Sequence, residues 1–427
     1  MHVLPQLREL ESRYGHDIAM IGVHSGKYTA ERDTARIRDA SLRLGATHPI
    51  VNDRQFRIWR AYAVGAWPTL VAVDARGYVV GMRAGEFTAA ALAPFIEGAI
   101  ARGREAGITA SAPLIASLDA PSRAPSQLAF PGKVAVDGRR IAIADSGHHR
   151  VLVGTLDDAG TTVRVERTVG GPDAGWRDGA DPLFTNPQGL VFHGDLLYLA
   201  DAGSHTVREI SGTGTRTLAG IGRPLRGAVD EAQGALSSPW DIACAGDTLY
   251  IAMAGVHELW TVSRSTGVAT VLSGSGAEEL HDAPHADAAL AQPMGLVVHD
   301  DRLWFVDAET SAVREADRAA EGAVRTIVGT GLFDFGDVDG TGDDARLQHP
   351  QGIARAPDGR LLVCDSYNDA LRWVDPATRR VTTWVRGLHE PGGVAIGATH
   401  AYVADTNAHR IVAVPLGTGV VTEVTLA

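Results

Sequence analysis

The 427-residue sequence predicts a small α/β unit followed by an all-β ring of six sheets. Three observations indicate this arrangement: one repeat occurs six times, each copy holds several short apolar strands, and the first hundred residues lack the repeat. A copy has a proline, an apolar strand and a second strand that usually ends in aspartate, with an arginine five to seven residues later. The copies begin at Pro131, Pro187, Pro239, Pro293, Pro350 and Pro391.

The length of the repeat predicts the blades of a β-propeller. Consecutive copies start 56, 52, 54, 57 and 41 residues apart, and a period of roughly 40–50 residues with several strands is typical of propeller blades. Two further apolar runs, VLVGTL and VRVERTVG in the first copy, bring each unit to four strands. Six such units close into a ring over residues 123–427 and leave only short edges. The segment VVTEVTL is the expected last strand of blade six, with Leu114–Leu118 as the alternative.

Composition and charge narrow the class of protein. Apolar residues make up 45% of the chain and the net charge is −12, so large cores can form. Residues 1–110 hold 14 Lys and Arg against 11 Asp and Glu, which leaves 25 against 40 for the remainder. An acidic propeller repels a phosphate backbone, so nucleic acid is not an expected partner. The sequence shows neither an apolar run of about 20 residues nor a leader pattern, so we expect no membrane partner and a cytoplasmic location.

Two cysteines, Cys244 and Cys364, lie in the apolar strands IACAG and LLVCD. Two are too few for a disulfide framework, and free cysteine in such a place usually behaves as a small buried hydrophobe. We therefore expect both thiols to be buried and unreactive.

The first hundred residues follow a different pattern, in which helices alternate with strands. Residues 17–23 (DIAMIGV) form a nearly continuous apolar run, as expected of a strand buried on both faces of a parallel sheet. Thr88 is expected to cap the last helix. The expected order is helix 1–14, strand 17–23, helix 29–44, strand 48–53, helix 54–62, hairpin 69–74 with 78–82, and helix 88–100.

This order, with Trp67-Pro68-Thr69 just before the hairpin, resembles the thioredoxin fold. The stretches MIGVHSGKY, HPIVND, WPTLVAVDARG and FPGKVAVDGRRIAIADSGHHRVLV make nearly the whole chain resemble the thioredoxin-like proteins that carry NHL repeats. The resemblance implies a cis peptide bond before Pro68, where an ordinary trans bond is the alternative. It also implies a partner-binding region that includes Trp67, Pro68, Thr69, His24 and Ser25.

The sequence departs from this family at one place. The resemblance implies a further strand and a redox Cys-x-x-Cys just ahead of the Met-His that opens this sequence. We therefore expect residues 1–103 to form a thioredoxin-like domain without its first strand and redox motif, with Met1 an internal methionine misread as a start. Residues 104–122 are the expected linker. Without that strand, the strands at 17–23 and 69–74 are expected to lack their common neighbour.

The resemblance to NHL repeats also assigns an aspartate after the second strand and a downstream arginine. Repeat three departs from both, with Met253 at the aspartate position and Glu258 or Leu259 near the arginine position. Because the pairs recur in nearly every blade, we interpret them as architectural rather than catalytic; such an aspartate accepts backbone N–H groups and can pair with arginine. The pairs are Asp145 and Arg150, Asp201 and Arg208, Asp307 and Arg314, Asp365 and Arg372, and Asp405 and Arg410.

Two other groups of polar residues suggest binding sites. The long acidic linkers between blades are expected to lie over one face of the propeller, where partners bind. One of them, Asp337–Asp344 (DVDGTGDD), superficially suggests calcium, but it lacks the ligand ladder of an EF-hand and is interpreted as a solvated loop. Histidines recur shortly after the second strand in four blades, and exposed turn positions are favoured over a metal site. They are His149, His205, His257 and His409.

Three functions remain open. The favoured one is a protein-interaction scaffold whose partners bind the propeller loop face, with no catalytic residues, metal or cofactor. The first alternative is a thiol–disulfide oxidoreductase whose Cys-x-x-Cys lies upstream of a misassigned start. The second is a propeller hydrolase or lyase with a metal near the axis.

Overall fold

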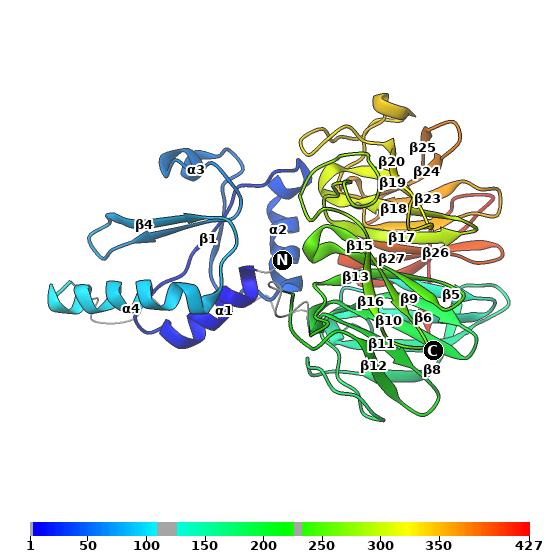
Figure 1. Ribbon diagram of the computed structural model, residues 1–427, viewed down its shortest axis with the longest axis horizontal. Coiled ribbons are helices and arrows are strands. Elements are labelled where there is room, and N and C mark those ends of the chain that lie inside the picture. The colour runs from blue at the N-terminus through cyan, green and yellow to red at the C-terminus, as the bar shows by residue number, and fades with distance from the viewer. Residues whose placement is uncertain (1–2, 109–125, 226–232) are drawn as a thin grey trace. The chain divides into compact units, whose positions relative to one another are not determined.

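The computed structural model describes residues 3–108, 126–225 and 233–427 (Figure 1). The chain divides into two compact units, Met1–Ala124 and Pro125–Ala427, and each is described by itself. The predicted linker at 104–122 lies mostly outside the described residues. Within the described ranges, no helix has both the length and the apolar character needed to cross a bilayer.

The second unit is a six-bladed β-propeller, as the repeat predicts. Each blade contains four antiparallel strands that lie side by side in chain order. Blade one consists of β5 (Val134–Asp137), β6 (Arg140–Asp145), β7 (Arg150–Leu156) and β8 (Thr162–Gly170). Blade two consists of β9 (Pro187–His193), β10 (Leu196–Asp201), β11 (Thr206–Ile210) and β12 (Thr215–Ala219). Blade three consists of β13 (Pro239–Ala245), β14 (Thr248–Met253), β15 (Glu258–Ser263) and β16 (Ala269–Ser273).

Blades four to six repeat the same plan, and blade five carries one extra short strand, β21 (Gly340–Thr341), at its outer edge. Blade four consists of β17 (Pro293–His299), β18 (Arg302–Asp307), β19 (Ala312–Asp317) and β20 (Val324–Val328). Blade five consists of β22 (Gly352–Arg355), β23 (Leu361–Asp365), β24 (Ala370–Asp375) and β25 (Arg380–Arg386), in addition to β21. Blade six consists of β26 (Pro391–Ile396), β27 (His400–Asp405), β28 (Arg410–Pro415) and β29 (Thr422–Glu423).

The ring closes through the first strand of every blade and through the C-terminus. Each first strand contacts the first strands of both neighbouring blades, and β26 of blade six contacts β5 of blade one. The segment VVTEVTL does not form one strand, contrary to the expectation. It divides into β29, which pairs with β28, and β30 (Thr425–Leu426), which pairs in parallel with β8 of blade one. The alternative closing segment, Leu114–Leu118, lies outside the described residues.

The apolar core lies between the blades. A large buried cluster lies at each of the six junctions between adjacent blades, and a smaller one also joins blades three and four. The cluster between blades one and two contains Ala142, Phe184 and Leu199, all at 0% exposure. The inward and outward side chains of each strand alternate, so every sheet supplies apolar side chains to both neighbours. The hydrophobic effect therefore favours the closed ring over separate blades.

The first unit contains the predicted helices and strands; three strands are shorter than predicted, and the second strand of the hairpin is one residue longer. Its two sheets are separate: β1 pairs in parallel with β2, and β3 pairs antiparallel with β4. The elements are α1 (Val3–Tyr14), β1 (Gly22–His24), α2 (Thr34–Arg43), β2 (Ile50–Asn52), α3 (Arg57–Ala61), β3 (Thr69–Val73), β4 (Val79–Ala84) and α4 (Ala89–Glu105).

Two expectations for this unit are corrected and two are confirmed. The strand predicted at 17–23 is reduced to β1, because it pairs on one edge only with three residues of β2. Its apolar side chains are not buried on both faces: Ile21 and Val23 are 55% and 43% exposed. The peptide bond before Pro68 is cis. The side chain of Thr88 caps α4 by accepting the Ala91 N–H.

Candidate interaction site

The same polar contacts recur from blade to blade, and they centre on an aspartate at the end of the second strand. In five blades this carboxylate is fully buried, and its Oδ1 accepts the backbone N–H of a residue just before the blade's proline. In blade three the Sδ of Met253 occupies the same place and accepts the Ser237 N–H at 3.4 Å. The five donors are Ala129 for Asp145, Thr185 for Asp201, Ala291 for Asp307, Gln348 for Asp365 and His389 for Asp405.

The second oxygen of each aspartate contacts the predicted arginine, but the arginines fall into two classes. In blades one and six, Arg150 and Arg410 begin the third strand, and their side chains are 28% and 29% exposed. In blades two, four and five the arginine lies two residues further along, and its side chain is fully buried. The N–O distances are 3.2 Å for Arg208 to Asp201, 3.0 Å for Arg314 to Asp307 and 2.9 Å for Arg372 to Asp365.

Each buried arginine also holds the linker that precedes its blade. Arg208 contacts Asp178 of the linker at 2.7 Å, and the other Asp178 oxygen accepts the Thr217 N–H of the fourth strand at 2.9 Å. We call this arrangement of a buried arginine, a linker aspartate and a fourth-strand threonine a latch. The other two latches consist of Arg314, Asp282 and Thr326, and of Arg372, Asp339 and Thr383.

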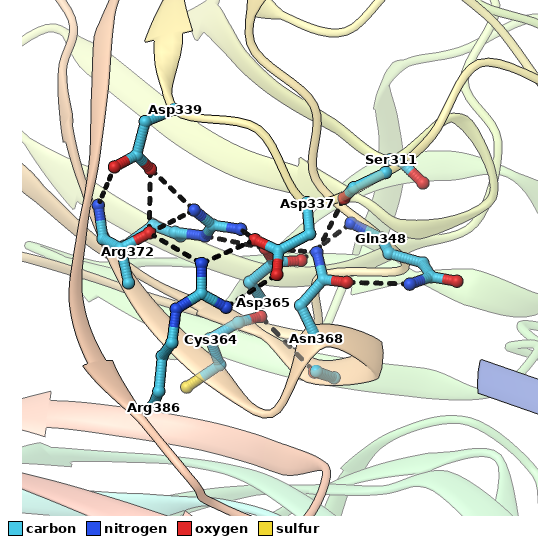
Figure 2. Close-up of polar contacts among 12 residues, drawn as sticks. Ser311, Asp337, Asp339, Gln348, Cys364, Asp365, Asn368, Arg372 and Arg386 are labelled. Carbon is cyan, nitrogen blue, oxygen red and sulfur yellow. Dashed lines mark hydrogen bonds and ion pairs between the residues drawn. The ribbon is translucent and has the colours of Figure 1, made fainter. Parts of the chain in front are cut away.

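Figure 2 shows the latch of blade five, which has an additional carboxylate. Asp337 pairs with Arg372 and also with Arg386, the latter at 2.6 Å. The linker Asp337–Asp344 is therefore not a simple solvated loop, as the sequence suggested, because guanidinium groups neutralise its first two carboxylates. In the described ranges no group of His, Cys, Asp or Glu is arranged to hold a metal ion.

Two carboxyl groups contact the buried Arg208, and the balance between burial and hydrogen bonding shifts their pKa values in opposite directions. Burial raises the pKa of Asp201 to about 7, although the Thr185 N–H and Arg208 oppose it. Burial also acts to raise the pKa of Asp178, but the Thr217 and Arg208 hydrogen bonds outweigh it and hold that pKa below its usual value. The half-exposed linker carboxylate is therefore ionised at neutral pH and supplies a firm counter-ion to the buried arginine.

The recurring histidines connect neighbouring blades. Each has a positive φ just before the third strand and accepts, through Nδ1, the backbone N–H of the residue before the next blade's proline. Ser311 and Asp369 do the same in blades four and five. The interpretation of exposed turn histidines is thus corrected: they are half-buried acceptors between blades. The donors are Asn186 to His149, Ser238 to His205, Gln292 to His257 and Phe130 to His409.

Protonation of such a histidine removes its acceptor, so this contact predicts a pH dependence. Burial and the neighbouring His148 lower the pKa of His149 against the attraction of Asp145 and Asp173. The neutral form is therefore favoured in the folded state, and its contribution is lost as pH falls below the ordinary histidine value of about 6.5. We expect His149→Asn, which keeps an acceptor and tolerates positive φ, to reduce the loss of unfolding free energy between pH 7 and pH 5. Urea unfolding at both pH values measures this, and an unchanged pH dependence contradicts it.

An ion pair fills the axis of the propeller. The third residue of each repeat is glycine in four blades, whereas it is Lys133 in blade one and Asp241 in blade three. Lys133 Nζ lies 3.4 Å from Asp241 Oδ2, and it donates to the carbonyls of Met294, at 2.9 Å, and Gln351. The strands approach so closely that a Cβ at Gly189 would lie 2.5 Å from the Cα of Asp241. A buried cation at the axis disfavours a metal ion there, so the axis lends no support to the hydrolase or lyase alternative.

Both cysteines lie in strands of the propeller blades, where burial lowers their reactivity. Cys364 is fully buried in β23, and burial raises its pKa to about 12. Cys244 is half-buried rather than buried; its Sγ lies 3.4 Å from His193 Nδ1, and burial raises its pKa as well. Thiol–disulfide exchange requires an accessible thiolate, so these two cysteines do not support a redox function.

We therefore expect this chain of 427 residues to reduce insulin only at the background rate. We also expect Ellman's reagent to leave Cys364 unmodified until the protein unfolds. Insulin turnover above background that disappears in the Cys244→Ser/Cys364→Ser variant contradicts the assignment of both thiols as structural.

Of the five residues predicted to bind partners on the first unit, Trp67 and Ser25 are in direct contact. Trp67 Nε1 donates to the Ser25 carbonyl at 2.8 Å, which joins the segment after β1 to the segment before β3. Ser25 Oγ donates in turn to the buried Asp53. His24 Nε2 is buried without a hydrogen-bond partner among the described residues, and Thr69 Oγ1 donates to the Ala66 carbonyl.

The latches, the contacts between blades and the axial ion pair were not predicted from the sequence. The latches have a signal in the sequence, because each buried arginine stands seven residues after its aspartate, whereas Arg150 and Arg410 stand five residues after theirs. The axial pair also has one, because Lys133 and Asp241 occupy a position that is glycine in the other four copies.

These features define a six-bladed β-propeller protein whose repeats are held by internal aspartate–arginine pairs. The family model for the NHL repeat matches residues 128–153. NHL repeat-containing protein 2 of Gallus gallus is 36% identical over 480 residues, which cover 98% of this chain and 65% of that protein. The chain thus carries an NHL repeat and is similar along nearly its whole length to an NHL repeat-containing protein.

Further similarities extend beyond animals and to solved structures. Protein SUPPRESSOR OF QUENCHING 1, chloroplastic, of Arabidopsis thaliana is 36% identical over 460 residues, which cover 98% of this chain and 43% of that protein. A chain in the crystal structure of a nidogen/laminin complex matches with a TM-score of 0.49 at 15% identity, covering 66% of this chain and 92% of that chain. The present chain thus spans less than two thirds of the length of NHL repeat-containing protein 2 and of the Arabidopsis protein.

Proposed function

We propose that this chain is a non-catalytic interaction protein that binds protein partners through the inter-blade linkers of its propeller. The observation that carries the proposal is the position of exposed apolar side chains on latched linkers. Trp176 is 47% exposed beside Asp178, and Phe333 and Val338 are 73% and 47% exposed on the linker that carries Asp337. Rigid, exposed aromatic side chains are common anchors of protein interfaces.

The latches supply the rigidity that such anchors need. A linker held by charged hydrogen bonds loses less conformational entropy on binding than a free loop, which strengthens the complex. The axis is filled by Lys133 and Asp241, so the linkers and rims of the propeller are the surfaces left for a partner. Both points favour the scaffold over a function that needs a ligand in the central channel.

The proposal predicts that partner capture depends on the linker anchors. We expect the Trp176→Ser/Phe333→Ser variant to lose at least tenfold in quantitative affinity capture of protein partners, with the fold intact by circular dichroism. The matched control is Val268→Ser/Val420→Ser, which removes two side chains that are 60% and 61% exposed elsewhere on the propeller. Equal capture by both variants contradicts the proposal.

We further propose that residues 1–103 form a thioredoxin-like domain that provides a second docking surface, with residues 104–122 as linker and 123–427 as propeller. Two observations support this assignment: the peptide bond before Pro68 is cis, and the Trp67 side chain donates to the Ser25 carbonyl. A cytoplasmic location also stays a prediction, and cell fractionation tests it. The redox alternative requires a dithiol in addition to Cys244 and Cys364, and insulin turnover by a chain carrying one would favour it.

A further inference from the structure

Three aromatic side chains gather beside the cis proline of the first unit. The ring centroids of Trp59 and Trp67 lie 4.5 Å apart, and the Phe56 ring lies 5.8 Å from Trp59 and 6.4 Å from Trp67. The guanidinium of Arg32 lies 5.8 Å from the Phe56 centroid. Trp67 is 47% exposed, so the cluster reaches the surface.

The local structure that presents these rings is tightly held. The Asp53 carboxylate is buried and accepts four hydrogen bonds, from Ser25 Oγ and from the N–H groups of Arg57, Ile58 and Trp59. Phe56 has a φ of 56°, in the left-handed region. Positive φ is rare for a bulky residue, and such strain is commonly found at functional sites. Here it accompanies a ring packed against two tryptophans.

Four exposed arginines belong to the segments that carry or contact this cluster. Arg54, Arg57 and Arg60 lie in the same short segment as Phe56 and Trp59, and Arg32 contacts the Phe56 ring. Across residues 3–108 none of the four forms an ion pair with a carboxylate. We define the basic-aromatic patch by these seven residues: Arg32, Arg54, Arg57, Arg60, Phe56, Trp59 and Trp67.

We propose that the basic-aromatic patch is a docking surface for an acidic, extended segment of a partner protein. Tryptophan and arginine dominate interface hot spots. Guanidinium groups without a carboxylate partner among the described residues offer paired donors that match carboxylates, although Arg60 also donates to the Gln55 carbonyl at 2.7 Å. Apolar side chains of the same segment would pack on Trp67. The proposal rests on the proposed function and adds the chemistry of one partner to it.

The charge of the whole chain favours an acidic peptide over a nucleic acid. A net charge of −12 repels a long polyanion at long range. A short acidic segment meets the arginines within about one Debye length, roughly 8 Å at physiological salt, where the local positive charge dominates. The patch thus suits a few carboxylates next to apolar side chains rather than a continuous phosphate backbone.

The test uses the full chain and a fluorescein-labelled decapeptide of glutamate with two leucines, followed by fluorescence anisotropy. We expect saturable binding that weakens with added salt and weakens at least tenfold in Arg54→Gln/Arg57→Gln/Arg60→Gln. The matched control is Arg76→Gln/Arg83→Gln/Arg102→Gln, which removes the same charge from three other exposed arginines of the unit and should bind within twofold of the original. Trp67→Ala should also weaken binding.

Several outcomes overturn the proposal. They are absence of binding to the original chain, an equal loss in both triple variants, and tighter binding of a ten-nucleotide oligo(dT) than of the peptide. Equal binding of a decapeptide in which lysine replaces glutamate also overturns it. These outcomes are distinguishable from failure of the scaffold function, which depends on Trp176 and Phe333 and is measured separately.

Discussion

Replacing Lys133 with methionine is expected to lower the free energy of unfolding of the propeller by about 3–5 kcal/mol, the usual effect of leaving one buried charge without its partner. Asp241 is 9% exposed, and burial already raises its pKa against the attraction of Lys133. The Met294 and Gln351 carbonyls lose their donor in the same variant. Urea unfolding measured by tryptophan fluorescence quantifies the change.

The matched control for this prediction is the double variant Lys133→Met/Asp241→Asn. Asparagine removes the uncompensated charge, while its carbonyl can still accept the Leu296 N–H that Asp241 now accepts at 3.1 Å. We expect the double variant to recover at least half of the lost stability, since a neutral pair of similar volume is often tolerated in place of a buried ion pair. A change below about 0.5 kcal/mol in the single variant contradicts the axial role.

The second large effect is expected for Arg208→Met. This change leaves Asp201 buried, frees the Asp178 linker and removes the donor to the Leu183 and Arg177 carbonyls. We expect a loss of about 3–5 kcal/mol in unfolding free energy. We also expect weaker partner binding, because Trp176 lies on the released linker.

Arg150→Met is the natural comparison for Arg208→Met. The Arg150 side chain is 28% exposed, and the buried Asp145 carboxylate keeps a second partner, His148 Nδ1, at 2.7 Å when the arginine is removed. We expect a smaller loss of about 1.5–3 kcal/mol, the usual contribution of one hydrogen bond to a charged group. Calorimetry on the two variants separates the classes, and equal losses are inconsistent with the distinction between buried and half-exposed arginines.

The architecture of the propeller could be predicted from the sequence because its determinants are local and repeated. The proline, the aspartate and the arginine of one blade lie within about 25 residues, and six copies reinforce one interpretation. The pairs that involve distant residues could not be predicted in the same way. Arg208 and Asp178 are 30 residues apart, and Lys133 reaches carbonyls as far as Gln351.

The first unit, which has no repeat, could be predicted less completely than the propeller. Its helices were predicted because amphipathic spacing and the Thr88 cap act within a few residues. The strand at 17–23 was predicted too long, because apolar character alone does not state how many hydrogen-bonding neighbours a strand has. The region around Trp67 was predicted to bind partners because the chain resembles a known family. The contact between Trp67 and Phe56 was not predicted, because it depends on a positive φ at Phe56 that the sequence does not indicate.

The most direct test of the scaffold function is the dissociation constant of a captured partner, measured beside the melting temperature. For Trp176→Ser/Phe333→Ser, we expect affinity to fall at least tenfold while the melting temperature stays within about 2 °C, since exposed side chains contribute little to folding. Unchanged affinity in this variant, or affinity that falls only together with the melting temperature, would contradict the assignment of the latched linkers as the binding surface.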